Sequence, residues 1–256
     1  MTKSDSLALA VANSQIINVY VKYINSLVGR DKACRLGQYF ARLLAYVVSR
    51  RVLLSGKTPA RLSWLTSLAT IQQTLSTTRK VMRSGKFVSF VQQAVQTLFS
   101  QQDEVVKAFG LVHKLGMGAF MLADWWGLLS TMKLVRIRDP ARVARMGQRA
   151  WMYALLAQLF SALYQMHQVS LRAADLQRVR RHVEKAGDVI SDRECAVEEQ
   201  AIGLQKSALH RQLVTAALDL TIPVKGLGIL PLNEGVVALA GTVTSLLGIE
   251  DVLVKK

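Results

Sequence analysis

The sequence predicts an all-α fold, with amphipathic helices in the N-terminal half and membrane-embedded helices in the centre and at the C-terminus. Hydrophobic residues make up 51% of the 256 residues, and the mean hydropathy of +0.23 is above that of most soluble domains. Alternation of apolar and polar residues, which is typical of strands, is rare. The four prolines fall at positions 59, 140, 223 and 231, and we expect helices to be broken there.

The charge of the chain is strongly positive and unevenly spread. The formal net charge is +16, and residues 1–102 contain 14 Lys and Arg against only Asp5 and Asp31. An anionic partner is therefore expected, and both nucleic acid and acidic lipid head groups satisfy this. The high apolar content and the absence of a nucleic-acid-binding signature favour a lipid membrane over nucleic acid.

We divide the chain into four regions by composition. They are a basic amphipathic region at 1–102, membrane-associated helices at 103–171, a charged helix or linker at 172–211, and a membrane-buried C-terminal segment at 212–256.

The first strong amphipathic helix is expected at residues 31–54. At 100° per residue its apolar side chains gather on one side and its charged side chains on the other. The apolar side comprises Leu36, Tyr39, Phe40, Leu43, Leu44 and Val47, and the polar side comprises Asp31, Arg35, Gln38, Arg42 and Ser49. A core-facing helix of a soluble protein has the same pattern, but the basic rim with Arg35 and Arg42 favours a membrane surface.

The second amphipathic helix is expected at residues 61–83. Its apolar stripe consists of Trp64, Leu68, Ile71, Leu75 and Met82. Its polar face is rich in Ser and Thr and has no charge in its middle. Since Ser and Thr are mediocre helix formers in water, such a helix suits insertion into loosely packed lipid. A packed helix with a polar outer face is the alternative.

Four cations end this second helix, namely Arg79, Lys80, Arg83 and Lys86. Each is worth about 1 kcal/mol near an anionic leaflet, so together they predict salt-sensitive attachment. A further amphipathic segment follows at 87–98.

Three segments are candidates for membrane spans: 115–132, 150–164 and 213–249, the last broken by prolines. Asp124 in the first would cost about 2.5–3.5 kcal/mol at the bilayer centre, so we expect it to face protein or water. The second is short enough to be a half-buried helix. The charged stretch 172–211 repeats apolar residues every seventh position, which indicates a partner seam. The repeating residues are Leu176, Val183, Ile190, Val197 and Leu204.

A stripe of small residues near the C-terminus predicts close helix packing in lipid. It consists of Ala238, Gly241, Ser245 and Gly248. A soluble helical hairpin would carry the same stripe.

No catalytic, cofactor or metal site is expected. The SGKT run at 55–58 has Arg51 where a phosphate-binding loop needs its first glycine. The four histidines lack metal-ligand spacing, and the two cysteines do not suggest a disulfide framework.

Three stretches resemble the peroxin eleven family. They are DKACRLGQYFARLLAYV at 31–47, TTRKVMRSGKF at 77–87 and LGILPLNEGVVALAGTVTSLLGI at 227–249. The resemblance implies a peroxisomal membrane protein with both termini in the cytosol. It further implies a protein that self-associates as a homo-oligomer, elongates the membrane through amphipathic helices and recruits the organelle fission machinery. A peroxisomal pore for small metabolites is the alternative function.

Overall fold

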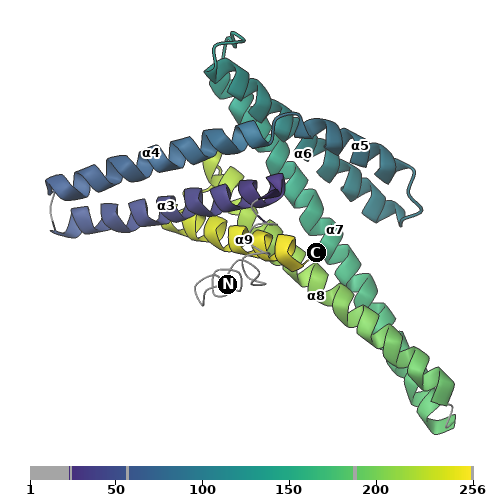
Figure 1. The fold of residues 1–256 in the computed structure, drawn as a ribbon. Helices are drawn as coiled ribbons and strands as arrows, with labels where there is room; N and C mark the ends of the chain where they lie inside the picture. The colour runs from purple at the N-terminus through teal and green to yellow at the C-terminus, as the bar shows by residue number, and fades with distance from the viewer. Residues whose placement is uncertain (1–22, 24, 56–57, 187–188, 255–256) are drawn as a thin grey trace, which may run out of the picture. The chain divides into compact units, whose positions relative to one another are not determined.

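The computed structural model describes residues 23, 25–55, 58–186 and 189–254. These residues form seven helices and no strand, which confirms the all-α prediction (Figure 1). The helices are α3 (Leu27–Ser55), α4 (Pro59–Met82), α5 (Lys86–Leu98), α6 (Glu104–Thr131), α7 (Pro140–Ala186), α8 (Val189–Gly226) and α9 (Glu234–Val254).

Local sequence accounts for most helix ends. Pro59 and Pro140 begin α4 and α7, where a missing N–H costs nothing. Gly85 separates α4 from α5 with a φ of 73°, a conformation that glycine adopts without strain. Asp103 caps α6, since its Oδ1 accepts from the Val105 N–H at 2.9 Å. The break expected near Pro223 falls just after it, because α8 contains this residue and ends at Gly226.

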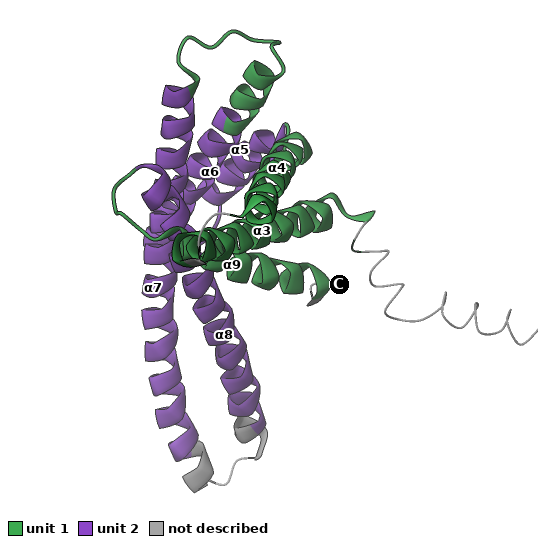
Figure 2. Cartoon of the chain, turned by 90° about the vertical axis from the view of Figure 1, so that its left-hand side faces the viewer, with its two compact units in different colours: residues 1–84, 124–140, 228–256 green, residues 85–123, 141–227 purple. Residues whose placement is uncertain are grey.

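The chain divides into two compact units, which are interleaved in the sequence (Figure 2). Unit 1 takes in residues 1–84, 124–140 and 228–256, and therefore α3, α4, α9 and the end of α6. Unit 2 takes in residues 85–123 and 141–227, and therefore α5, most of α6, α7 and α8.

In unit 1, α3 packs against both α4 and α9. The contact with α9 depends on small residues, because the ring of Tyr39 occupies the space that a Cβ on Gly241 would need. Ala238 and Ser245 on the same face are fully buried, and Gly248 lies against Lys32. The small-residue stripe thus packs on another helix of the same chain.

In unit 2, α7 and α8 form a helical hairpin (Figure 1). Its core consists of Ala162, Val169, Ile202 and Leu209. The predicted seam was wrong on α8, where Val197 and Leu204 are 68% and 67% exposed. The packed positions on α8 are also seven residues apart, but they start from Cys195 and not from Val197. They are Cys195, Ile202, Leu209 and Ala216.

In the part of the chain that the structure describes, two helices are long and apolar enough to cross a membrane, α6 and residues Glu234–Leu253 of α9. They contain the greater part of the predicted segment 115–132 and the end of 213–249. The predicted segment 150–164 lies inside the long helix α7, which does not meet the same criterion among the described residues.

Replacing Gly241 by Leu should destabilise unit 1 by about 1–3 kcal/mol, because the added side chain has to displace the Tyr39 ring. The matched control is Val243→Leu on the exposed face of α9, which should leave stability nearly unchanged. Thermal unfolding in detergent micelles measures both variants. Equal melting temperatures for Gly241→Leu and the wild-type chain would contradict the packing of α9 on α3.

Candidate functional site

Unit 1 contains a cluster of charged side chains where the start of α3 meets the end of α4. Arg79 of α4 donates from Nε to Asp31 Oδ1 of α3 at 3.0 Å, and Arg83 Nη2 donates to Asp124 Oδ2 of α6 at 2.7 Å. Lys80 Nζ lies 3.4 Å from the other oxygen of Asp124. Arg83 also reaches Asp31 at 3.9 Å, so the two carboxylates share one cation. Asp124 therefore faces protein. We predicted this from the free-energy cost of placing its carboxylate in lipid.

This charge cluster (Asp31, Arg79, Lys80, Arg83 and Asp124) is largely shielded from solvent. Both carboxylate side chains are 15% exposed, and those of Arg79 and Arg83 are 11% and 13% exposed. Removing one partner of such an ion pair is strongly destabilising, because the other charge then stays buried without compensation.

Arg79 is the most enclosed member of the charge cluster. Besides Asp31 it donates to the Gln38 side-chain oxygen at 2.8 Å, so one guanidinium joins two positions of α3. Burial lowers the pKa of Arg79, the neighbouring charge of Arg83 lowers it further, and Asp31 acts in the opposite direction. Because an arginine begins far above neutrality, the guanidinium stays charged at physiological pH.

Two arginines of α3, Arg35 and Arg42, bind residues of α9. Arg35 is buried, donates to the Thr244 hydroxyl at 3.1 Å and lies over the Tyr39 ring. Arg42 places both Nε and Nη2 on one carboxylate oxygen of Glu234, at 2.9 and 2.6 Å. The polar side of α3 thus faces the interior of unit 1.

The opposite sides of α3 and α4 are apolar and exposed. Phe40, Leu44 and Val47 are exposed on α3, as are Trp64 and Ile71 on α4. A soluble protein normally arranges these residue classes the other way round. Unit 1 thus exposes large apolar side chains beside the Ser/Thr face of α4, while most of the charge cluster is shielded from solvent.

The residues predicted to bind membrane fall into three groups. Phe40, Trp64, Ile71 and Lys86 are exposed, and Leu36, Arg42, Leu43, Leu75, Lys80, Met82 and Arg83 are partly buried. Arg35, Tyr39, Leu68 and Arg79 are buried in unit 1, and their side chains contact protein. Direct membrane contact by these four stays a prediction; in this structure Arg35 and Tyr39 contact α9, and Arg79 contacts α3.

Four threonine hydroxyls of α4 are satisfied by the helix backbone without water. Thr66, Thr70, Thr77 and Thr78 each donate to the backbone carbonyl four residues earlier, at 2.9–3.1 Å. This back-bonding removes much of the cost of placing a hydroxyl in an apolar surrounding. The Ser/Thr face is therefore compatible with lipid.

Several partners in this site were missed by sequence reasoning. Nothing near Glu234 or Thr244 indicated that each would bind an arginine about 200 residues earlier. A usable signal did exist, because Asp31 and Asp124 are rare acidic residues in otherwise basic or apolar surroundings. A charged side chain in such surroundings is unfavourable unless an opposite charge pairs with it, so each of these two acids predicts a basic partner.

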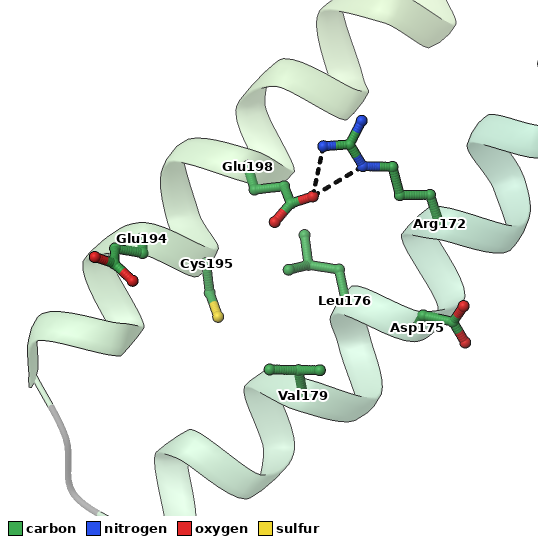
Figure 3. Close-up of a pocket in the computed structure, with 7 residues that line it drawn as sticks. All are labelled: Arg172, Asp175, Leu176, Val179, Glu194, Cys195 and Glu198. Carbon is green, nitrogen blue, oxygen red and sulfur yellow. Dashed lines mark hydrogen bonds and ion pairs between the residues drawn. The ribbon is translucent and has the colours of Figure 1, made fainter.

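A second concave site lies between α7 and α8 and has a volume of about 420 Å³ (Figure 3). Arg172 and Glu198 close one side with an ion pair of 2.7 Å, and Leu176, Val179 and Cys195 line the space between the helices. Among the described residues no group of His, Cys, Asp and Glu could hold a metal ion. The pocket offers one thiol beside an ion pair and an apolar wall.

Comparison with known proteins gives consistent matches along most of the chain. The model of the family described as Peroxisomal biogenesis factor 11 matches residues 17–253. The Peroxisomal membrane protein PMP27 of Saccharomyces cerevisiae is 29% identical over 91% of this chain and 92% of its own length. The Peroxisomal biogenesis factor 11 of Schizosaccharomyces pombe is 22% identical over 95% and 97%, respectively.

A mammalian relative matches over a similar extent. The Peroxisomal membrane protein 11A of Bos taurus is 26% identical over 91% of this chain and 95% of its own length. No solved structure matches this chain.

A double-mutant cycle on Arg83→Gln and Asp124→Asn tests the charge cluster. Each single change should destabilise unit 1 by about 3 kcal/mol, and the double variant should lose clearly less than the sum, because neither change then leaves a buried charge unpaired. The exposed pair Arg178 and Asp175 is the matched control and should show a coupling below about 0.5 kcal/mol. Additive losses at Arg83 and Asp124 would refute the pairing.

Proposed function

This chain belongs to the Peroxisomal biogenesis factor 11 family, and on that premise we propose that it is a peroxisomal membrane protein that elongates the membrane and promotes peroxisome proliferation. The relatives in Saccharomyces cerevisiae and Bos taurus are named as peroxisomal membrane proteins, and the relative in Schizosaccharomyces pombe is named as a peroxisomal biogenesis factor. The proposed role is mechanical and not enzymatic: the protein changes the shape of the bilayer by inserting helices into it.

The observation that carries this proposal is the apolar exterior of α3 and α4. Burial of one large apolar side chain contributes about 1.5–3 kcal/mol, and at least five such side chains point outward from these two helices. Contact with lipid acyl chains would bury these side chains and so stabilise the arrangement. A pair of helices inserted from one side expands that leaflet, and the expansion favours curvature.

The cations have two different roles in this proposal. Arg79 and Arg83 are engaged by carboxylates, and their role is to hold α4 in place. Lys86, Arg50 and Arg51 are exposed near the ends of the α3–α4 pair, where head groups would lie. Attraction of anionic lipid is assigned to these exposed cations, each worth about 1 kcal/mol.

Self-association and recruitment of the organelle fission machinery belong to the proposal through the family resemblance. The small-residue stripe of α9 does not support self-association, because α3 covers it. The homo-oligomer must use another surface. Both termini are proposed to face the cytosol.

The alternative function, a pore for small metabolites, drew on Asp124 as a polar group inside the membrane. In this structure Asp124 is engaged by Arg83 and Lys80 within unit 1. No other observation favours conduction over remodelling.

Replacing Ile71 by Glu should abolish peroxisome elongation, because a carboxylate on the inserted face opposes burial by about 2.5–3.5 kcal/mol. Ile71 is the appropriate position because it is exposed, whereas Leu68 is buried and its replacement would also damage the fold. The matched control is Thr70→Glu, which adds the same charge at the adjacent exposed position on the polar face. Fluorescence microscopy of peroxisome length gives the readout.

The control variant should elongate peroxisomes nearly as well as the wild type. Normal elongation by Ile71→Glu, in protein that reaches the peroxisome in normal amounts, would overturn the proposed function.

A further inference from the structure

We propose that the connection between α6 and α7, residues 132–139, binds the head groups of anionic lipids. This site is separate from the cations near the ends of the α3–α4 pair, to which the proposed function assigns attraction of lipid. The inference goes beyond the proposed function, because elongation of the membrane by α3 and α4 does not require this connection. It shares only the membrane setting of that function.

The connection lies in the most strongly basic stretch between α6 and α7. From residue 133 to residue 149 the chain has six basic residues and a single acidic residue, Asp139. Three of the six lie in the connection itself, namely Lys133, Arg136 and Arg138, and the other three follow in the first part of α7. The proposal depends only on the three in the connection, which all belong to unit 1.

These three side chains are available to a ligand. All of them are exposed, and none forms an ion pair with a described residue. They differ in this respect from Arg79 and Arg83, which donate to Asp31 and Asp124 within unit 1. A cation that a carboxylate already neutralises attracts an anionic lipid weakly, whereas an exposed cation without such a partner keeps its full attraction.

The position of the cations after α6 indicates what they bind. This helix is a candidate membrane span, and the connection follows it directly (Figure 2, green between two purple helices). Residues 125–132 contain no Asp, Glu, Lys or Arg, so the uncharged end of α6 continues up to the first cation. A run of Lys and Arg directly after a membrane span lies close to the lipid head groups, and such runs bind anionic lipids.

The end of α6 accounts for only one of the three cations by structure alone. The Leu134 N–H donates to the Leu129 carbonyl at 3.0 Å, and Lys133 has a φ of 61°, a conformation that glycine adopts more easily. Positive charge at the last turn of a helix is favoured by the helix dipole, which explains a lysine at this position. Arg136 and Arg138 lie beyond that turn, so the dipole does not explain them.

Apolar side chains between the cations favour a lipid over other anionic partners. Met132 and Leu134 are 52% and 70% exposed and stand on either side of Lys133. At a membrane surface such side chains enter the acyl region, while the long basic side chains beside them extend to the phosphates. Nucleic acid or an acidic protein segment would satisfy the cations and leave both apolar side chains in water.

Energy transfer to labelled lipids in proteoliposomes tests this site. The full chain carries a donor dye at Thr131→Cys, the exposed last residue of α6, in a Cys34→Ser, Cys195→Ala background. The acceptor dye is attached to the acyl chain of either phosphatidylserine or phosphatidylcholine. The fraction of the labelled lipid in the vesicles is then titrated, and only protein that floats with the vesicles is measured.

Two variants with the same loss of charge are compared with the wild-type chain. The connection variant combines Lys133→Gln, Arg136→Gln and Arg138→Gln. The matched control combines Arg178→Gln, Arg193→Gln and Lys206→Gln, which removes three charges from the α7–α8 hairpin.

We expect the wild-type chain and the control to gather phosphatidylserine around the dye in preference to phosphatidylcholine. The connection variant should need at least about tenfold more phosphatidylserine for half-maximal transfer, since each lost cation weakens the attraction about fivefold. Added salt should reduce the preference of the wild-type chain, because it screens exposed charges.

Three results would overturn the site and leave the proposed function intact. They are equal transfer to both lipids in the wild-type chain, a preference that the connection variant keeps, and an equal loss of preference in the connection variant and the control. The last would show that net charge, and not this connection, attracts the lipid. Failure of the wild-type chain to float with the vesicles would instead contradict the membrane setting, and with it the proposed function.

Discussion

The ion pair between Arg83 and Asp124 is the interaction on which the arrangement of unit 1 depends. Asp124 lies in α6, a helix apolar enough to cross a membrane, and a carboxylate there is unfavourable unless a cation reaches it. Arg83 supplies that cation at 2.7 Å and also approaches Asp31 of α3. One guanidinium at the end of α4 therefore links residues of α3 and α6, which lie far apart in the sequence. This accounts for the dense run of cations at 79–86 better than lipid attachment alone does.

Once charge is placed inside, the remaining features of the unit follow. The polar side of α3 has to face α4 and α9, since Asp31, Gln38 and Arg42 bind partners there. Its apolar side, with Phe40 and Leu44, is then left outside. Glycines on α9 allow the Tyr39 ring to approach closely, and hydroxyls on α4 satisfy themselves on their own backbone. Each of these features suits a helix bundle surrounded by lipid.

Sequence reasoning located the helices well because periodicity and prolines are local signals. Residues 31–54 and 61–83 were expected to be helical, and α3 and α4 occupy Leu27–Ser55 and Pro59–Met82. Periodicity separates two faces of a helix but does not say which one meets protein, so the inward direction of Arg35 and Arg79 could not be derived from it. The residues predicted to form the packing seam of α8 were wrong for a related reason. Two sets of apolar residues there share a spacing of seven, and only the packing of α7 against Cys195 and Ile202 decides between them.

The most direct test of an apolar exterior around a charged interior is collision accessibility by electron paramagnetic resonance. Nitroxide labels at Phe40 and Ile71 would be compared with one at the exposed position Gln101, in the full chain reconstituted into bilayers that contain anionic lipid. Our account predicts that Phe40 and Ile71 collide readily with oxygen, which dissolves in hydrocarbon, and rarely with a water-soluble nickel chelate, with the opposite preference at Gln101. Access of the nickel chelate to Phe40 and Ile71 at the level found for Gln101 would contradict it.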